Sequence, residues 1–460
     1  MTLNEHRAMH SIETLSGTAA RRMFALAALT AALAGAPALE AQSPIPAPLQ
    51  SQPIALRGAT IHTVTNGVIE NGTIVFENGV ITAVGADVAI PAGARTVDAT
   101  GKHIYPGLID AYSTVGIAEI GAVDVTNDDR ELGQFNPNAR PNIAVNPESR
   151  HIGTTRSNGV LVTLTTPSGG LMPGLSSAMN LEGWTWEEMT LEAAAALNVN
   201  WPDPEAGNNE DDDEEEDEGG EEEPTYEEQI RQLRDFFAQA RAYRGAKAAG
   251  GHVPSDSRFD AMIPALDREI PVVVSADGVQ QIQDAVRWAE DEDVSLIIRG
   301  GTDAIHVADH LAEKQIPVIL TETMSPPARS WEPYDGAYTR AARLHERGVR
   351  IAISGGSGAA YTNRLPYEAG VAVAFGLPEE EAIKAVTLYP AQFMGIADRV
   401  GSLEAGKDAT LLITTGSPLD YLANIEQAYI EGREIDMQDI HRFFFEKYME
   451  KVRQKQRVIS

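Results

Sequence analysis

Charged residues stand where the predicted strands of this sequence end. Arg299 closes the apolar segment "VSLIIRGG", Asp277 and Glu322 close two other apolar segments, and Asp303 lies just beyond Arg299. A guanidinium beside carboxylates can bind the carboxylate of a substrate through two parallel hydrogen bonds. It can equally form a buried ion pair with an acid such as Asp277. The sequence leaves both interpretations of Arg299 open.

Hydroxyl groups and small residues fill comparable positions near other predicted strand ends. The segment "PGLIDAYSTVG" leads from an apolar strand into Asp110, Tyr112 and Thr114. Ser275 lies within "PVVVSADG", and Gly356 ends "AISGG". We expect these residues to line one polar pocket together with the charged residues.

The elements that position these residues alternate between apolar strands and segments of helical period. Continuous β-branched strands that alternate with helices imply a parallel sheet buried on both faces. We therefore predict an α/β protein with a TIM-type (β/α)8 barrel over residues 105–397. In such barrels the chemistry lies at the carboxyl ends of the strands. The predicted strands cover residues 159–166, 271–278, 294–301, 316–323 and 349–356, and the clearest helices cover 278–293 and 303–315.

Short strands dominate the two ends of the remaining chain. Residues 42–104 contain alternating apolar residues broken by three Asn-Gly pairs, which favour hairpin turns. Residues 398–436 have a similar pattern. We expect the two pieces to form one small composite β-sandwich, with the barrel inserted between them. Residues 437–460 predict an amphipathic helix, which we expect to dock onto the body of the protein in preference to a membrane.

Charge is concentrated in one segment. Residues 203–228 hold sixteen acidic residues and no basic one, so removing them from the net charge of −31 leaves −15. Eight consecutive acids from Asp211 to Glu218 cannot pack, and we expect a disordered acidic loop that is solvated or serves as an interaction tail. The acidic balance argues against a nucleic-acid partner. The absence of cysteine excludes disulfides, thiolate metal sites and cysteine nucleophiles.

The first 41 residues have the pattern of a signal peptide. Arg21 and Arg22 precede an apolar run that is too short to span a membrane, and small residues follow it. The arginine pair resembles a twin-arginine export signal, although an ordinary basic segment fits equally well. We expect an exported protein, periplasmic or extracellular, without a membrane span.

Two motifs some 300 residues apart resemble those of a known family. "VDATGKHIYPGLIDAYSTVG" is similar to the start of the amidohydrolase superfamily barrel, and "TLYPAQFMGIADRVGSLEAGKDATLLI" is similar to its end. Other segments resemble an imidazolonepropionase-like branch of exported bacterial proteins. The resemblance covers nearly the whole chain apart from the acidic loop and the first 41 residues. It implies a barrel with a composite sandwich that hydrolyses amide or other C–N bonds, using one or two divalent metals such as zinc.

The positions that hold metal ligands in that family carry other residues here. Tyr112 and Thr114 replace the paired histidines of the first strand, and Ser275 and Arg299 replace those of strands five and six. Gly356 or a neighbour replaces the aspartate of strand eight. A guanidinium would repel a divalent cation. We therefore expect a degenerate metal site and no cofactor.

Other residues offer weaker evidence for a site. His306 and His310 have the i, i+4 spacing of a zinc pair, but no HExxH glutamate accompanies them, and a plain surface pair is the stronger interpretation. Tyr361 and Asn363 follow the last strand and could contact a ligand, or they could lead into the next helix.

Three functions remain open from the sequence. The first is a binding protein for a small amide-like or peptide-like ligand, or a metal-free enzyme. The second is an active hydrolase that recruits metal through unusual ligands such as Asp110, Asp277 and Glu322. The third is a non-catalytic partner of an active paralogue, in a homo- or hetero-oligomer.

Overall fold

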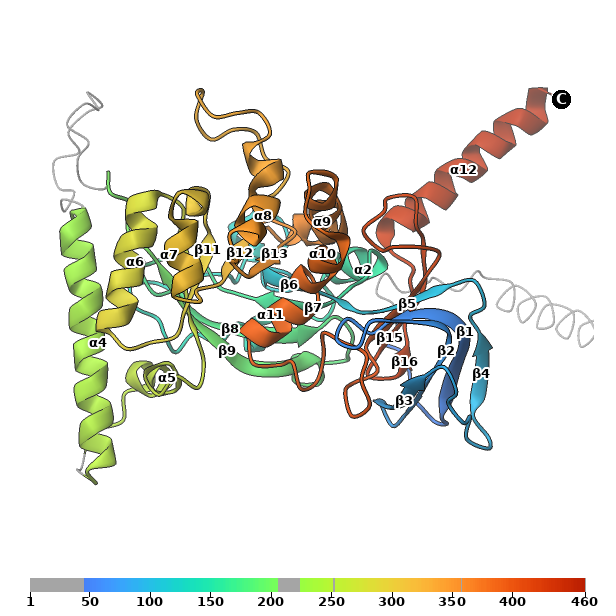
Figure 1. Ribbon diagram of the computed structural model, residues 1–460, viewed down its shortest axis with the longest axis horizontal. Coiled ribbons are helices and arrows are strands. Elements are labelled where there is room, and N and C mark those ends of the chain that lie inside the picture. The colour runs from blue at the N-terminus through green and yellow to red at the C-terminus, as the bar shows by residue number, and fades with distance from the viewer. Residues whose placement is uncertain (1–44, 206–223, 251–252, 357, 460) are drawn as a thin grey trace, which may run out of the picture. The chain divides into compact units, whose positions relative to one another are not determined.

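The computed structural model describes residues 45–205, 224–250, 253–356 and 358–459 (Figure 1). The predicted signal peptide and the acids from Glu210 to Glu223 lie outside these residues. Among the described helices, none is long and apolar enough to cross a membrane.

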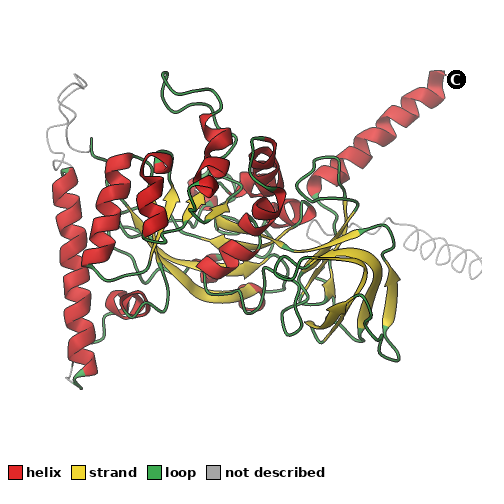
Figure 2. Cartoon of the chain, viewed as in Figure 1, coloured by secondary structure: helices red, strands yellow, loops and turns green. Residues whose placement is uncertain are grey.

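A sheet of eight strands forms the barrel, in the order β13-β12-β11-β10-β9-β8-β7-β6. Figure 2 shows the strands of the chain in yellow and its helices in red. All five strands predicted from the apolar segments are present, each within its predicted range, so the TIM-type barrel is confirmed. The strands are β6 (Leu108–Ser113), β7 (Val160–Thr165), β8 (Gly174–Asn180), β9 (Thr190–Asn200), β10 (Val272–Ala276), β11 (Leu296–Gly300), β12 (Val318–Leu320) and β13 (Ile351–Ile353).

One strand departs from the regular (β/α)8 pattern. β8 runs antiparallel to both β7 and β9, whereas the other neighbouring strands are parallel. The eight residues between β7 and β8 are too few for a crossover helix, which takes a dozen or more residues. The chain therefore turns back as a hairpin here, and the barrel gains a strand without a helix.

The alternation of side chains along each strand decides which of them enter the barrel. Val273, Ile297, Ile319 and Ala352 belong to one buried cluster, which fills the barrel interior. Their neighbours on the same strands, such as Val272 and Val274, belong to the cluster that packs under the outer helices. Successive residues point to opposite faces of a sheet. Ser275 and Arg299, two residues beyond Val273 and Ile297, therefore face the interior at the carboxyl ends of β10 and β11.

Helices follow most of the parallel strands. The predicted helix over 278–293 is present as α6, and the one over 303–315 is split into a 3-10 helix and α7. The α-helices of the barrel region are α2 (Arg150–Ser157), α3 (Trp186–Met189), α4 (Tyr226–Ala248), α5 (Ser257–Leu266), α6 (Val279–Asp291), α7 (Ala308–Glu313), α8 (Gly336–Glu346), α9 (Leu365–Ala374), α10 (Glu379–Ala385) and α11 (Leu388–Phe393), and the 3-10 helices are η1 (Asp124–Thr126), η2 (Pro141–Ala144), η3 (Ala304–Val307) and η4 (Ala359–Arg364).

The end of the predicted disordered segment is ordered. α4 begins at Tyr226, where the Thr225 side chain accepts from the Glu228 backbone N–H and the Glu228 side chain accepts from the Thr225 backbone N–H. This reciprocal pair satisfies two backbone donors at the helix start. The prediction of disorder was therefore wrong for residues 225–228.

A second sheet joins the two ends of the chain, as predicted. Its order is β16-β15-β14-β5-β1-β2-β3, and β4 also pairs with β1. β5 and β14, about 300 residues apart, pair along their full lengths. Its strands are β1 (Ile54–His62), β2 (Val68–Glu77), β3 (Val80–Gly85), β4 (Arg95–Asp98), β5 (His103–Pro106), β14 (Leu411–Thr414), β15 (Ile425–Ile430) and β16 (Arg433–Glu434).

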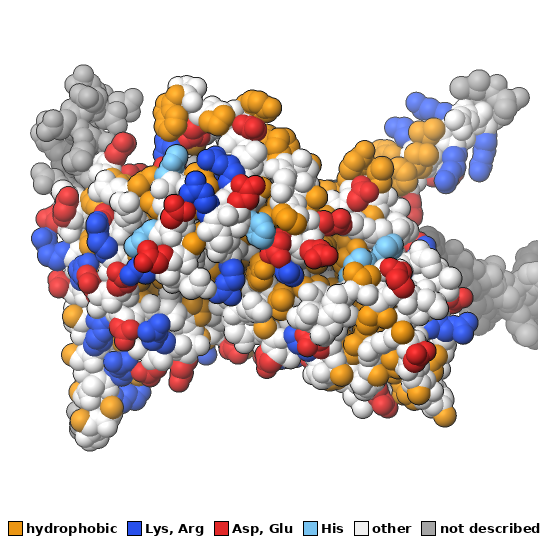
Figure 3. All heavy atoms as spheres, viewed as in Figure 1, with side chains coloured by type: hydrophobic (Ala, Val, Ile, Leu, Met, Phe, Trp, Pro, Cys, Tyr) orange, Lys and Arg blue, Asp and Glu red, His pale blue; other side chains and the backbone are white. Residues whose placement is uncertain are grey.

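The final helix is present, but it does not bury its apolar face. α12 spans Ile440–Ile459, and its residues from His441 to Arg457 are exposed except for Glu450, which is half-buried. Figure 3 shows apolar and basic side chains side by side along this helix. The expectation that α12 docks onto the body of its own chain is therefore wrong.

Candidate functional site at the carboxyl ends of the barrel strands

Three polar side chains form a row across neighbouring strands. Asn200, the last residue of β9, is the register partner of Ser275 in β10, and Ser275 is the register partner of Arg299 in β11. The Nη2 of Arg299 donates to the hydroxyl of Ser275 and to Oδ1 of Asn200, at 3.3 Å from the latter. Because the three residues are register partners on neighbouring strands, their side chains lie within hydrogen-bonding distance of one another.

Tyr112 completes this cluster from β6. Its ring centroid lies 4.0 Å from the guanidinium carbon of Arg299, a cation–π contact. Tyr112, Asn200 and Ser275 are half-buried, whereas Arg299 is only 8% exposed. The four residues, called the Arg299 cluster below, form a polar site with a buried cation at its centre.

The guanidinium of Arg299 is incompletely satisfied. Its Nη1 is buried and has no hydrogen-bond partner. Within the described part of the chain, no carboxylate forms an ion pair with Arg299. Burial lowers the pKa of Arg299, yet an arginine side chain stays protonated in proteins. The cluster therefore contains a buried positive charge that forms no ion pair within the described residues.

The structure contradicts the ion-pair interpretation of Arg299. Asp277 lies one residue beyond the end of β10 and is exposed. It accepts hydrogen bonds from the backbone N–H of Thr302 at 3.1 Å and from the Thr302 hydroxyl at 2.6 Å. Its carboxylate therefore ties two loops together and forms no ion pair with Arg299, although it attracts the guanidinium electrostatically.

Asp303 also has another partner. Arg329, from the loop after β12, binds its two carboxylate oxygens at 2.9 and 2.8 Å. This bidentate pair holds the pKa of Asp303 below its ordinary value. Asp303 thus anchors the loop before α8 and does not line the cluster with Arg299 as predicted.

Asp110 and Thr114 make hydrogen bonds that connect the first barrel strand to the segment after the last one, a junction called the seam below. Asp110 is fully buried and accepts from the backbone N–H groups of Tyr112 at 3.0 Å and of Gly355 at 3.1 Å. The Thr114 hydroxyl accepts from the backbone N–H of Ala359 at 3.0 Å. Burial raises the pKa of Asp110 to about 7, against the opposing effect of these hydrogen bonds. Both residues join the strands and do not line an open pocket.

The remaining predicted residues have other surroundings. Glu322 is exposed. Tyr361 is exposed and stacks under Arg364, at 4.4 Å from its guanidinium carbon. Asn363 uses its backbone carbonyl to accept from Asn158. Gly356 is buried, with its N–H 3.4 Å from the Ser354 hydroxyl. Of the predicted pocket, Tyr112, Ser275 and Arg299 come together, and Asn200 is an addition.

Comparisons with known proteins agree with this fold. Residues 301–435 match the amidohydrolase family. A solved amidohydrolase from Thermotoga maritima superposes with a TM-score of 0.73 at 25% identity, over 84% of this chain and all of the other. The chain belongs to the amidohydrolase superfamily.

Two curated relatives align with most of this chain. An imidazolonepropionase from Mesorhizobium japonicum is 25% identical over 380 residues, which cover 75% of this chain and 87% of the relative. The amidohydrolase tasK from Hapsidospora irregularis is 23% identical over 398 residues. That match covers 78% of this chain but only 39% of tasK.

The metal centre implied by the superfamily does not fit the residues at this site. The Arg299 cluster offers a guanidinium, a phenol ring face, a hydroxyl and an amide, whereas zinc in proteins is bound by imidazole, carboxylate or thiolate ligands. No three His, Cys, Asp or Glu side chains of the described residues gather closely enough to hold a metal ion. His306 lies in η3 and His310 in α7, without a third ligand. The donor set therefore suits an anion better than a cation.

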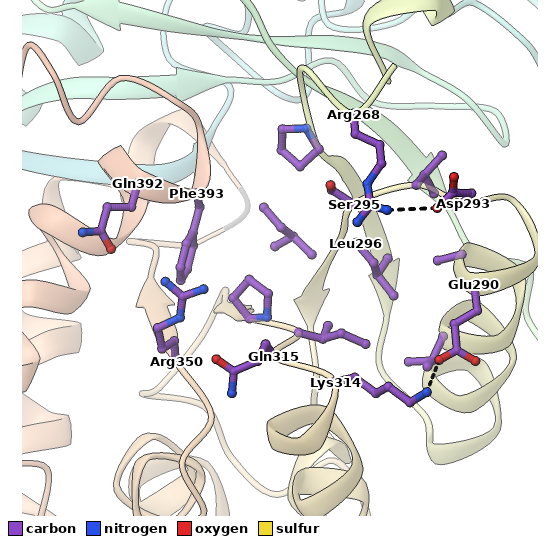
Figure 4. Close-up of a pocket in the computed structure, with 17 residues that line it drawn as sticks. Arg268, Glu290, Asp293, Ser295, Leu296, Lys314, Gln315, Arg350, Gln392 and Phe393 are labelled. Atoms are coloured by element: carbon purple, nitrogen blue, oxygen red, sulfur yellow. Dashed lines mark hydrogen bonds and ion pairs between the residues drawn. The ribbon is translucent and has the colours of Figure 1, made fainter. Parts of the chain in front are cut away.

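A pocket of about 860 Å³ lies at the other end of the same strands (Figure 4). Residues that precede or begin β10 to β13 line it, among them Pro271, Leu296, Pro317 and Arg350. Active sites of such barrels lie at the carboxyl ends. We therefore assign the candidate site to the Arg299 cluster and not to this pocket.

Proposed function

We propose that this amidohydrolase-superfamily protein binds a small amide-like or peptide-like ligand that carries a carboxylate, and that it does so without the usual metal centre. The observation that supports the proposal most directly is the buried Nη1 of Arg299, which has no partner. A buried charge without a counter-charge is costly. A ligand carboxylate that supplies the missing acceptor would remove that cost and gain a charge-assisted hydrogen bond.

The surroundings of Arg299 support a ligand with both polar and apolar parts. Asn200 and Ser275 offer an amide and a hydroxyl, while the half-buried ring of Tyr112 covers the guanidinium. Because Nη1 is buried, we expect the Tyr112 ring to shift when the carboxylate enters. The amide and hydroxyl groups then suit the polar backbone of a peptide-like ligand.

No observation favours the two alternative functions. Asp110, Asp277 and Glu322, the unusual metal ligands considered above, have separate surroundings: a buried seam, an exposed turn and an exposed loop. The acidic loop proposed as an interaction tail lies outside the described residues. We also propose that the protein acts in the periplasm or outside the cell, on the sequence pattern of residues 1–41, and fractionation of expressing cells tests this.

Ligand binding is tested by thermal unfolding in the presence of paired probes. A panel of dipeptides and acylated amino acids is compared with the same molecules amidated at the carboxyl terminus. We expect stabilisation by the free acids and little by the amides. Arg299→Gln should weaken binding by about tenfold to a hundredfold, the loss expected for a hydrogen bond to a charged group. Arg350→Gln, at the opposite end of the barrel, is the matched control and should bind normally.

Elemental analysis of the purified protein complements this experiment. Near-stoichiometric zinc, manganese or iron, retained after dialysis, would contradict a metal-independent site. Equal stabilisation by acids and amides, unchanged in Arg299→Gln, would contradict carboxylate recognition.

A further inference from the structure

The pocket at the amino-terminal ends of β10 to β13 takes no part in the Arg299 cluster. Its volume of about 860 Å³ is comparable to those of small-molecule sites, which span roughly 300–1,000 Å³. Its apolar surface comes from the buried residues Leu296, Ile316, Pro317 and Phe393. A concave apolar surface with a few polar groups is typical of a ligand site. The polar groups therefore decide which ligand the pocket would suit.

Three helices next to the pocket end in strained turns. The turns after α5, α6 and α7 contain Arg268, Asp293 and Gln315 at positive φ, at 61°, 52° and 57°. In each turn, the N–H of this residue bonds to the carbonyl three residues back, and the next N–H bonds to the carbonyl five residues back. This is the Schellman motif, in which the residue at positive φ is usually glycine. A side chain at this position is strained because its β-carbon crowds the backbone.

Other helices of the same barrel end in this motif with glycine. The turns after α8, α9 and α11 contain Gly348, Gly376 and Gly395 at the corresponding position. None of these three glycines lines the pocket, whereas the three strained polar residues all do. Strained backbone conformations that persist in a fold are often found at functional sites. The polar side chains are thus retained, at a conformational cost, where they line the pocket.

One side of the pocket carries charges that neutralise each other. Arg268 pairs with Asp293 at 2.9 Å, and Lys314 pairs with Glu290 (Figure 4). The four side chains are between 40% and 84% exposed. Exposed pairs contribute little to stability, so the first pair does not explain why both of its members are kept at positive φ.

The opposite side of the pocket carries a cation without an acidic partner. Arg350 is exposed, and no acid of the described residues forms an ion pair with it. Its guanidinium carbon lies 5.5 Å from the centroid of the Phe393 ring, a cation–π contact, and the exposed amide of Gln392 lies on the same side (Figure 4). A single unpaired cation beside an apolar surface suits a ligand with one negative charge. A second negative charge would face the acids of the opposite side.

We propose that this pocket binds a small apolar molecule that carries one carboxylate, such as an aromatic or medium-chain acid. The carboxylate accepts hydrogen bonds from Arg350 and from the amides of Gln315 and Gln392. The apolar part lies against Phe393 and Pro317. Such a ligand needs no peptide group, so this proposal does not depend on the one made for the Arg299 cluster.

Isothermal titration calorimetry of the full chain tests the proposal. The probes are 1-naphthylacetate, 3-phenylpropionate and octanoate, each compared with its primary amide. We expect at least one acid to bind at millimolar concentration or below, and its amide to bind about tenfold to a hundredfold more weakly, the loss expected for a hydrogen bond to a charged group. Arg350→Gln should weaken binding of the acid by the same factor. No binding by any of the three acids, or equal binding by acid and amide, would overturn the proposal.

Arg347→Gln is the matched control for Arg350→Gln. Arg347 is an exposed arginine three residues earlier that pairs with Asp309 at 2.9 Å and does not line the pocket. This variant should bind the acid like the wild type. Binding that is retained in Arg350→Gln, or lost equally in Arg347→Gln, would show that the acid does not bind at Arg350.

A glycine substitution tests the strained turns. Gln315→Gly should raise the midpoint of thermal unfolding without ligand, because it relieves the strain at positive φ, and should weaken binding of the acid severalfold. Asn78→Gly, at φ 52° in the second sheet, is the control for the backbone effect and should leave binding unchanged. Stabilisation by Gln315→Gly with unchanged affinity would contradict a role of this strained residue in the pocket.

Discussion

The two ends of strands β10 and β11 differ in the burial and the ion pairing of their positively charged side chains. At the amino-terminal end, in the pocket of Figure 4, Arg268 lies 2.9 Å from Asp293 and Lys314 pairs with Glu290, all with substantial exposure. At the carboxyl end, Arg299 is buried and has no acidic partner. Exposed pairs of this kind contribute little to stability. The charge that is costly to bury is the one left unpaired.

This difference supports the proposal that a ligand binds at the carboxyl end of the strands. A chain selected only for stability would fill the space above β11 with an apolar side chain. Retaining a guanidinium there is consistent with a function that needs the charge. Asp110 adds a second ionisable group at the same end, fully buried in the seam.

The largest expected effect is on the pH dependence of the free energy of unfolding, compared between the wild type and Asp110→Asn. Burial raises the pKa of Asp110 to about 7, above its ordinary 3.8. The folded state therefore favours the protonated acid, whose stabilisation is complete below pH 4 and is lost as the pH rises through 7. The loss amounts to about 4 kcal/mol. The free energy of unfolding of the wild type, relative to Asp110→Asn, should fall by this order between pH 4 and pH 8 in urea titrations. A flat difference across this range would contradict the assignment.

Arg299→Met is expected to have a smaller effect on the free energy of unfolding, and to raise it. Without ligand, removing the unpaired charge should raise the free energy of unfolding by about 1–2 kcal/mol, since replacing buried charges by apolar groups is often stabilising. Arg268→Met at the amino-terminal end is the control and should change it by less than about 1 kcal/mol. Chemical denaturation of both variants checks this. Marked destabilisation by Arg299→Met would show that the guanidinium holds the barrel together.

Much of the barrel was predictable because its strands are continuous β-branched runs between helices. β9 was not predicted, since "LEAAAALNVN" is rich in alanine and lacks the β-branched residues that identify a strand. Asn200 was missed with it. The signal available was only its position, two residues after Asn198 at the end of an apolar segment.

The partners of the charged residues were harder to predict than the strands. Ser275 and Arg299 share an inward orientation because both are still within their strands. Asp277 has the same parity as Ser275, but β10 ends at Ala276 and the chain turns outward to Thr302. Because Asp277 lies one residue past the strand end, it does not form the ion pair with Arg299 that was one of the two interpretations left open by the sequence. Similarly, the amphipathic pattern of α12 predicted a helix but could not show what covers it.

The smallest effect concerns the exposed pair at the amino-terminal end. The side chains of Arg268 and Asp293 are 55% and 84% exposed, so a double-mutant cycle with Arg268→Ala and Asp293→Ala should give a coupling below about 1 kcal/mol that decreases with salt. The same cycle on Arg329 and Asp303, at the carboxyl end, should give a larger coupling, because that pair is bidentate and Asp303 is mostly buried. Equal couplings would mean that burial does not distinguish the two ends, and the cost assigned to the unpaired Arg299 would then need another explanation.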